Sequence, residues 1–331
     1  MSFKILRMGD PHVMVSNLQE SEKLLDFVKE TAQEHNVDAI EILGDLFHNH
    51  AVVRLEVLDF WRRKLTDLSS LGKPVVIIAG NHDMAGDKLN EGKFSAISTF
   101  KDIKNIEIVD RDLVVSFDGG KTFIGYRAYT SNHELFLEDS KKMKEKGVNI
   151  LVAHQTFTGS TYANGFFAED GIDPALVSQD YIISGHIHST QQIGKCWYPG
   201  TAKFDNANDA NLEKGIWICT HTKEGYSKQF ISTESVVTAI KKYTLKEGCD
   251  LPEMNPKNKN YLELEGSNAW IIQTKKKMKD VPNLQIKATP TDTRVVQDKT
   301  NTKTIWDFLK AGFKPVNGVS FDQIQTYLGE I

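Results

Sequence analysis

Histidine, aspartate and asparagine residues follow short apolar runs at five places in the first two thirds of the chain. Seven of these side chains are candidate metal ligands: Asp10, His12, Asp45, Asn81, His154, His186 and His188. The set combines imidazole nitrogen with carboxylate and amide oxygen and contains no sulfur. Such ligands suit Mn²⁺, Fe²⁺ or Zn²⁺ better than Ca²⁺ or a structural zinc cage. Seven ligands exceed the need of one ion, but they suit two ions that share a carboxylate.

The apolar runs that precede these residues are short and rich in isoleucine and valine, which favours buried β-strands. They lie at residues 5–8, 40–43, 75–78, 150–152 and 181–183. Helical patterns at residues 18–34 and 52–71 separate the first three runs. Alternating strands and helices predict an α/β domain, in which active sites collect at the carboxyl ends of the strands. We therefore expect the seven side chains to meet in one cleft.

Further β-strand patterns follow after residue 100, and we expect them to form a second sheet packed on the first. They lie at residues 106–109, 113–117, 122–129, 215–220 and 226–232. The polar stretch 251–260 contains two prolines and indicates a loop or linker. Beyond it, a strand at 261–265, a helix from the Ser267 cap to about Lys279, and a strand at 284–288 predict a small β-α-β unit.

The bulk composition is that of an ordinary globular protein: 331 residues, 40% hydrophobic and 25% charged. The formal net charge of −4 gives no support to a protein that coats nucleic acid, which would usually be basic. Three widely spaced cysteines indicate neither a disulfide framework nor a thiolate metal site. No apolar run is long enough to span a bilayer, and the start lacks a signal-peptide pattern. The sequence therefore predicts a cytoplasmic protein without membrane contact.

The five blocks that carry the candidate ligands resemble, in order and spacing, those of the calcineurin-like metallophosphoesterases. The segment 198–201 also resembles the strand and turn that follow the last block in that family. The resemblance implies an α/β sandwich of two mixed β-sheets flanked by helices, with a small C-terminal β-α-β capping domain and a helical tail. It implies a metallophosphoesterase (nuclease) domain at 1–235, a capping or DNA-binding domain at 236–295 and a partner-binding tail at 296–331.

The same resemblance distributes the seven candidate ligands over two metal ions. One ion would be held by Asp10, His12, Asp45 and His188, and the other by Asp45, Asn81, His154 and His186. His82 would stabilise the transition state or protonate the leaving oxygen, which suits an imidazole near neutral pH. Asp83 would orient His82 by accepting a hydrogen bond from it.

His48 narrows the resemblance to one branch of the family. Protein phosphatases of the superfamily place an Asp-Arg-Gly sequence after the second block and end the third block in glutamate. This chain instead has Leu46-Phe47-His48 and ends the third block in Asp83. That pattern resembles the nuclease branch, namely the SbcD-like exonuclease subunit of double-strand-break processing complexes and phage recombination endonuclease subunits. In that branch the histidine that matches His48 is implicated in placing DNA for cleavage.

The nuclease branch implies a Mn²⁺-dependent DNA exonuclease and endonuclease, with Mg²⁺ as the alternative metal, that acts in recombination, repair and replication. Its implied partners are DNA, an SMC-like ATPase bound by the C-terminal tail, and a second copy in a homodimer. The short chain favours a phage-type protein in the host cytoplasm. The alternative is a metallophosphoesterase acting on a cyclic nucleotide or small phosphomonoester, which the acidic net charge keeps open. A non-catalytic scaffold is disfavoured because the ligand set is intact.

Several residues outside the ligand set have two interpretations. On the predicted capping helix, phosphate contact and a solvated helix face are equally compatible with four lysines: Lys275, Lys276, Lys277 and Lys279. The aromatic residues Tyr162, Phe166 and Phe167 could stack on a base, but we expect them to pack under their loop. For His50 we expect a solvated loop rather than substrate contact. The stripe at 306–309 favours partner docking over core packing.

Overall fold

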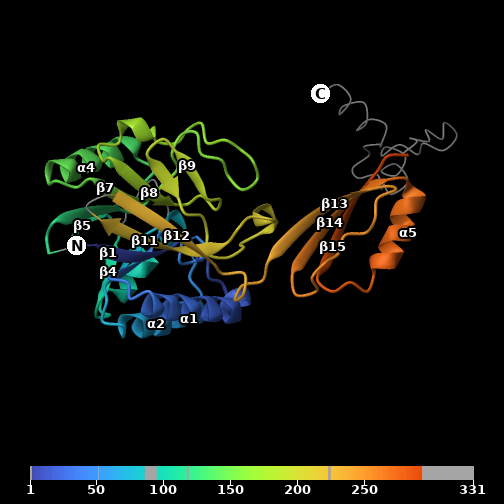
Figure 1. The fold of residues 1–331 in the computed structure, drawn as a ribbon, viewed down its shortest axis with the longest axis horizontal. Coiled ribbons are helices and arrows are strands. Elements are labelled where there is room, and N and C mark those ends of the chain that lie inside the picture. The colour runs from blue at the N-terminus through green and yellow to red at the C-terminus, as the bar shows by residue number, and fades with distance from the viewer. Residues whose placement is uncertain (1, 51, 86–94, 118, 223–224, 293–331) are drawn as a thin grey trace, which may run out of the picture.

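Two six-stranded sheets and a separate three-stranded sheet organise the chain (Figure 1). The computed structural model describes residues 2–50, 52–85, 95–117, 119–222 and 225–292. In Figure 1 the two large sheets lie face to face on one side of the picture, and the small sheet lies beside them. None of the described helices has both the length and the apolar character needed to cross a membrane.

The first sheet has the strand order β12-β11-β1-β2-β3-β4. Its strands are β1 (Phe3–Met8), β2 (Ala39–Ile42), β3 (Val75–Ile78), β4 (Ile106–Val109), β11 (Gly215–Thr222) and β12 (Gly225–Ser232). Strands β1 to β4 run parallel, and β11 joins β1 in the antiparallel sense. Every residue of β2 and β3 is buried, as near-continuous apolar runs in a two-sided parallel sheet require.

The second sheet has the strand order β5-β6-β7-β8-β10-β9. Its strands are β5 (Asp112–Phe117), β6 (Thr122–Arg127), β7 (Ile150–His154), β8 (Tyr181–Gly185), β9 (Gln191–Ile193) and β10 (Cys196–Tyr198). The central strands β6, β7 and β8 are parallel to one another. The expectation of two mixed sheets is therefore confirmed.

Helices cover the outer faces of both sheets (Figure 1). Helices α1 (Leu18–Glu34) and α2 (Leu55–Ser69) pack beside each other against the first sheet, and α4 (His133–Glu145) covers the second. The apolar stripe of α1 includes Leu24, Leu25 and Val28, spaced so that they share one face. Trp61 of α2 is fully buried, and its indole nitrogen donates to the Leu46 carbonyl at 3.1 Å. This contact anchors the loop that follows β2.

A buried polar group joins the two large sheets through their shared core. Arg7 of β1 pairs with Glu41 of β2 at 2.5 Å, and neither side chain is exposed. Tyr126 of β6, in the opposite sheet, donates its hydroxyl to the Glu41 carboxylate at 2.6 Å. A buried charge without partners would be costly, whereas here the guanidinium and the carboxylate both have partners.

The third sheet holds three parallel strands, β13 (Ile240–Lys246), β14 (Lys259–Gly266) and β15 (Leu284–Pro290), with α5 (Asn268–Met278) packed on them. Ser267 caps α5 by accepting from the Trp270 amide, as the sequence predicts. The sequence does not predict β13, because only Ile240 and Leu245 of this strand are fully buried and lysines interrupt the apolar alternation. The domain boundaries at 235 and 295 stay a prediction.

Candidate metal centre

The candidate ligands lie where five parallel strands end. Strands β1, β2 and β3 of the first sheet and β7 and β8 of the second deliver their carboxyl ends to the same edge. The backbone turns sharply there, and four site residues have positive φ: Asp10 (27°), His12 (42°), Asp45 (50°) and His186 (82°). Such conformations are uncommon outside glycine and concentrate at functional sites, where the surrounding fold holds them.

Close packing at this edge requires glycine before two of the blocks. A Cβ atom on Gly44, whose φ is +108°, would lie 2.2 Å from Nδ1 of His154. A Cβ atom on Gly80 would lie 2.1 Å from Oδ1 of Asp45. Side chains at either position would displace a candidate ligand, so these glycines let the strands approach the site.

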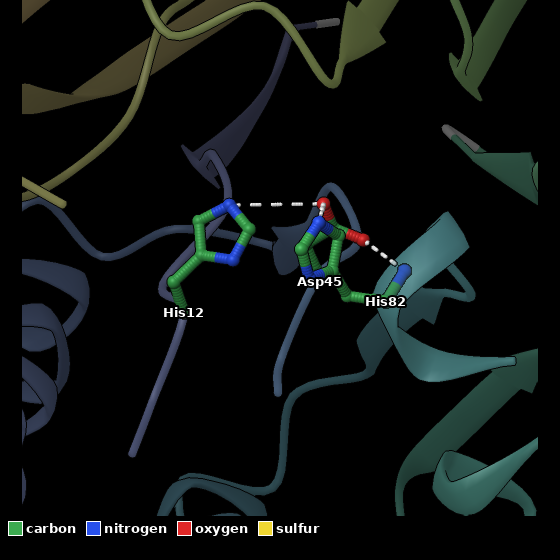
Figure 2. A group of neighbouring side chains, drawn as sticks. All are labelled: His12, Asp45 and His82. Atoms are coloured by element: carbon green, nitrogen blue, oxygen red, sulfur yellow. Dashed lines mark hydrogen bonds and ion pairs between the residues drawn. The ribbon is translucent and has the colours of Figure 1, made fainter. Parts of the chain in front are cut away.

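Asp45 stands at the centre of the cluster (Figure 2). Its Oδ2 lies 3.7 Å from Nε2 of His12, 3.4 Å from Nε2 of His154 and 4.0 Å from Nε2 of His82. The other oxygen, Oδ1, accepts a hydrogen bond from the His82 amide at 2.9 Å. One carboxylate oxygen is therefore held by the backbone, and the second faces imidazoles that arrive from two sides.

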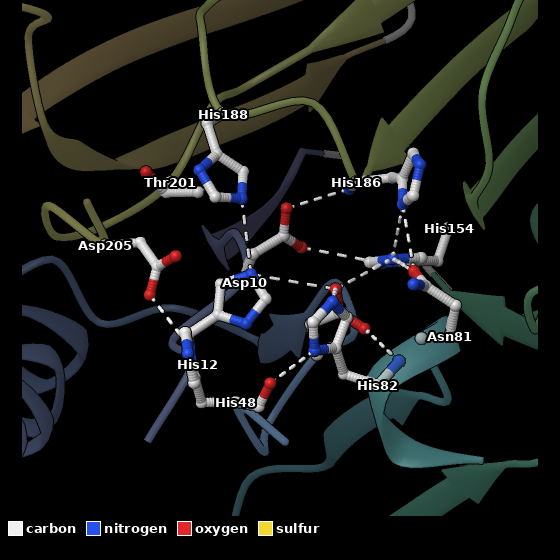
Figure 3. Close-up of polar contacts among 12 residues, drawn as sticks. Asp10, His12, His48, Asn81, His82, His154, His186, His188, Thr201 and Asp205 are labelled. Carbon is white, nitrogen blue, oxygen red and sulfur yellow. Dashed lines mark hydrogen bonds and ion pairs between the residues drawn. The ribbon is translucent and has the colours of Figure 1, made fainter. Parts of the chain in front are cut away.

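The remaining candidate ligands form two groups, one at His12 and His188 and one at Asn81, His154 and His186 (Figure 3). In the first group, Nε2 of His12 lies 3.3 Å from Nε2 of His188. In the second group, Oδ1 of Asn81 lies 3.1 Å from Nε2 of His154 and 3.0 Å from Nδ1 of His186. Asp10 lies between the groups, with Oδ2 on the His186 amide at 2.8 Å and Oδ1 3.5 Å from Nδ1 of His154. The structure thus brings all seven candidate ligands together.

The chemistry of these atoms fits divalent cations. Imidazole nitrogens and carboxylate or amide oxygens converge on one another within 3.0–3.7 Å. Oδ1 of Asp10 and Nδ1 of His12 are buried without a hydrogen-bond partner among the described residues. Such atoms are costly to bury unless something else satisfies them. Two cations sharing Asp45 would engage the opposed lone pairs, and the absence of sulfur favours a hard or borderline metal.

The electrostatics of the cluster also suit cations. Burial lowers the pKa of His12 and of His186 to about 3, which keeps their nitrogen lone pairs available. Burial also disfavours charge on His154, but Asp45 and Asp10 outweigh it and raise the pKa of His154 to about 9. The Asp45 carboxyl is likewise buried, yet His154 and His12 hold its pKa well below the usual range. Buried carboxylates that attract a proton onto His154 would equally attract a metal ion.

His82 lies at the mouth of the cluster, and two neighbours fix its ring. Its Nδ1 lies 2.5 Å from the His48 carbonyl, so that nitrogen is the donor and Nε2 faces Asp45. The ring of His50 stacks on it with 3.7 Å between centroids. His50 is exposed in a loop, as expected, and its ring contacts that of His82. Burial lowers the pKa of His82.

Asp83 does not orient His82 in the way the resemblance implies. Its carboxylate is buried and accepts from two backbone amides, Phe47 at 3.1 Å and Gly80 at 2.9 Å. Asp83 therefore ties the loop after β2 to the loop after β3, and it positions His82 only through the backbone. The sequence indicates the acidic residue but not its partner, because hydrogen-bond geometry depends on how two distant loops meet.

Sequence reasoning misses two aspartates near the site. Oδ1 of Asp205 lies 3.0 Å from Nδ1 of His48, and Oδ1 of Asp209 lies 3.1 Å from Nδ1 of His188. A carboxylate on the far nitrogen orients an imidazole and increases its basicity. Both aspartates belong to a polar stretch with two asparagines that has the composition of a surface loop, so no sequence signal distinguishes them.

The other proposed site residues fall into different surroundings. Tyr162 is half-buried with its ring centroid 6.3 Å from that of His186, whereas Phe166 and Phe167 are 71% and 69% exposed. The expectation that all three pack under their loop is therefore wrong for the two phenylalanines. The four lysines Lys275, Lys276, Lys277 and Lys279 are exposed on or next to α5, which lies away from the two large sheets (Figure 1). The partner-binding tail at 296–331 lies outside the described residues.

Comparison with known proteins adds independent evidence. The model of the calcineurin-like phosphoesterase family matches residues 3–190. A protein of Invertebrate iridescent virus 6 that is named as a phosphoesterase is 28% identical over 207 residues, which cover 60% of this chain and 69% of that protein. The DNA double-strand break repair protein Mre11 of Methanopyrus kandleri is 25% identical over 247 residues, covering 67% of this chain and 53% of that protein.

A shorter match links the chain to a component of the nuclease SbcCD from Escherichia coli, with 34% identity over 95 residues, 27% of this chain and 23% of that protein. The family match spans all five strand ends that carry the candidate ligands. Together with the sheet order and the convergence of these ligands, it shows that the chain belongs to the calcineurin-like phosphoesterase family.

Proposed function

We propose that this chain is a two-metal DNA nuclease that prefers Mn²⁺ and acts as a subunit beside an SMC-like ATPase in recombination and DNA-end processing. The observation that carries the proposal is the arrangement around Asp45, where two groups of ligands share one carboxylate and His82 and His48 stand next to them. The family hydrolyses phosphoesters, and such a centre suits displacement at phosphorus.

The residues would divide the work as follows. Asp10, His12 and His188 would hold one ion, Asn81, His154 and His186 the other, and Asp45 would bridge them. The ions, when bound, supply Lewis-acid chemistry and charge neutralisation at the phosphate. His82 keeps its Nδ1 on the His48 carbonyl, so Nε2 is the nitrogen that faces the reacting phosphate and that, when the ring is protonated, can give a proton to the leaving oxygen. His48, whose Nδ1 lies 3.0 Å from the Asp205 carboxylate, would place the DNA strand.

Several features support DNA as the substrate. His48 is the residue that resembles the nuclease branch, and the relatives include proteins named for DNA break repair and as a nuclease subunit. The relative from Escherichia coli is named as one subunit of the nuclease SbcCD, which supports a partner protein for this chain. That partner would bind through the tail at 296–331. A homodimer is proposed on the same resemblance.

A digestion assay tests the proposal. Linear double-stranded and single-stranded DNA are incubated with the protein in Mn²⁺, Mg²⁺ or EDTA, and wild type is compared with Asp45→Asn. We expect degradation that depends on Mn²⁺, is weaker in Mg²⁺, and disappears both in EDTA and in the variant. If DNA stays intact with every metal, including after addition of the ATPase partner, the proposal is wrong.

The alternative substrate is a cyclic nucleotide or small phosphomonoester, and the net charge of −4 is the observation that favours it. A small substrate needs no extended basic surface, whereas DNA does. The same assay therefore includes cyclic nucleotides and nucleoside monophosphates. Turnover of these compounds in the absence of any DNA cleavage would replace the nuclease proposal with this one.

A further inference from the structure

The connection between β7 and β8 forms a short hairpin beside the candidate metal centre. Its strands pair at Thr161 and Phe167, and the Tyr162 amide donates to the Phe166 carbonyl at 2.9 Å. The Gly165 amide donates back to the Tyr162 carbonyl at 2.8 Å, and Gly165 has a φ of +87°. This is a turn closed by a glycine bulge, in which Tyr162 and Phe166 are the cross-strand pair nearest the tip.

The pairing decides which way the two phenylalanines point. Residues directly opposite each other in an antiparallel pair share one face, and neighbours along a strand alternate. Phe166 therefore shares a face with Tyr162, whereas Phe167 shares the opposite face with Thr161. Ser160 and Ala168, which lie on the Tyr162 face, are almost fully buried, so this face is turned toward the body of the protein.

Tyr162 connects that inner face to the candidate ligands. Its ring meets the ring of His186 edge to face with 6.3 Å between centroids, and its hydroxyl lies 3.2 Å from that of Thr156. Phe166, the next residue along the same face, extends beyond the buried part of the hairpin and is 71% exposed. Phe166 is thus an exposed aromatic ring on the same face of the hairpin as Tyr162, which contacts His186.

We propose that Phe166 is a stacking platform for an unpaired nucleobase of the strand whose phosphate lies at the metal centre. The inference rests on the proposed function, since it names how that same site holds its substrate. Aromatic side chains stack on any base, because every base has a π-face, and such stacking stabilises single-stranded complexes without sequence preference. The exposed acidic residues Glu169 and Asp170 follow in the same hairpin, so it is unsuited to phosphate contact and suited to contact through base stacking.

The hairpin supplies its own control. Phe167 has the same side chain and nearly the same exposure, 69%, but lies on the opposite face. Three variants are therefore compared with wild type: Phe166→Ala, Phe167→Ala and Phe166→Trp. The substrates are a single-stranded oligonucleotide and an oligonucleotide of the same length in which every nucleotide is abasic. Metal content is measured for each variant, because Tyr162 links the hairpin to His186.

We expect Phe166→Ala to lower kcat/KM on the normal oligonucleotide by about tenfold, within the usual range for loss of one base stack. The kcat/KM of Phe167→Ala stays close to the wild-type value, and that of Phe166→Trp is retained. On the abasic strand the difference between wild type and Phe166→Ala disappears, and metal content is the same in all variants. Equal losses in Phe166→Ala and Phe167→Ala, or an equal loss of Phe166→Ala activity on the abasic strand, would overturn the stacking role.

Failure of the proposed function looks different. A wild-type protein that cleaves neither oligonucleotide but hydrolyses small phosphoesters overturns both proposals. A wild-type protein that cleaves DNA, together with a fully active Phe166→Ala variant, overturns the stacking platform alone. Loss of binding to a partner protein in Phe166→Ala, with DNA cleavage unchanged, would show that the exposed ring is a docking residue instead.

Discussion

Two regions of the molecule use charged residues in opposite ways. One is the edge of the two large sheets where the candidate ligands meet (the metal edge), and the other is the three-stranded C-terminal unit. At the metal edge, Asp10, Asp45 and His154 are buried and lie within a few ångströms of one another. In the C-terminal unit, the lysines on and next to α5 are exposed, and among the described residues their one ion pair is Lys279–Asp280 at 3.9 Å. Burying charged groups in fixed positions, as in the first region, is energetically unfavourable. The charges of the second region stay hydrated.

This contrast determines how strongly each region constrains function. Buried ionisable groups with mutually opposed ligand atoms are expensive, so their presence argues for a cation-binding role. Exposed lysines cost nothing, so a solvated helix face explains them as well as DNA contact does. The following predictions compare the two regions, from the largest expected effect to the smallest.

The largest effect is expected from His82→Ala. We predict that kcat on phosphodiesters falls by about 10² to 10⁴, the usual contribution of general acid–base catalysis, because Nε2 of His82 faces the candidate metal centre beside Asp45. Metal content, measured by mass spectrometry, stays at the wild-type level because His82 is not one of the seven ligands. Unchanged activity in a variant that still holds its metals would remove His82 from the mechanism.

The sequence is sufficient to predict which side chains meet at the metal edge, because the topology fixes where the strands end. An apolar run that ends in Gly44-Asp45 can place the carboxylate only at the edge where parallel strands terminate. Sequence reasoning fails where contacts depend on the meeting of distant loops, as for Asp205 on His48 and Asp83 on the Phe47 amide. It also fails for β13, whose lysines mask the period of its apolar residues.

A second prediction concerns pH and the body of the large sheets. His221 is buried between Phe3 and Tyr226 beside Arg7, and burial lowers its pKa to about 3. The unfolded chain takes up a proton near the ordinary histidine pKa of about 6.5, and the folded chain does not. The stabilisation is thus fully present above that value and decreases as the pH falls from about 6.5 toward 3.

We expect the free energy of unfolding to drop by about 2 kcal/mol more in wild type than in His221→Phe between about pH 7.5 and pH 5. Urea unfolding of the metal-free protein in EDTA measures it, so that metal release does not contribute. The histidines of the metal edge are present in both proteins, and their contributions cancel in the difference. An equal pH response of the two proteins would contradict the prediction.

The third prediction tests whether Asp205 acts through His48. Replacing Asp205 with Asn removes the charge 3.0 Å from Nδ1 of His48, and we expect kcat on DNA to fall about tenfold, as for other residues that orient a functional imidazole. The double variant with His48→Ala should be no slower than His48→Ala alone, since the two residues act as one unit. If the two substitutions lower kcat additively, or if Asp205→Asn loses bound metal, Asp205 acts on His12 rather than on His48.

The smallest effect is expected on α5, and it could break the contrast between the two regions. Helical spacing places Lys275 and Lys279 on one face and Lys277 on the other. If that face contacts phosphate, the double variant Lys275→Gln/Lys279→Gln should bind DNA about threefold more weakly. The slope of log affinity against log salt concentration should become shallower by about two, because each lost phosphate contact contributes about one. Lys277→Gln is the matched control and should leave both quantities unchanged.

We predict this pattern, with cleavage of short oligonucleotides unaffected because α5 lies away from the two large sheets (Figure 1). Identical slopes in the pair variant and in Lys277→Gln would show that the α5 lysines are only a solvated surface. The C-terminal unit would then have to serve the nuclease through its fold or its partner rather than through charge. In that case cations held at Asp45, if bound, would supply positive charge to the phosphates that the α5 lysines do not supply.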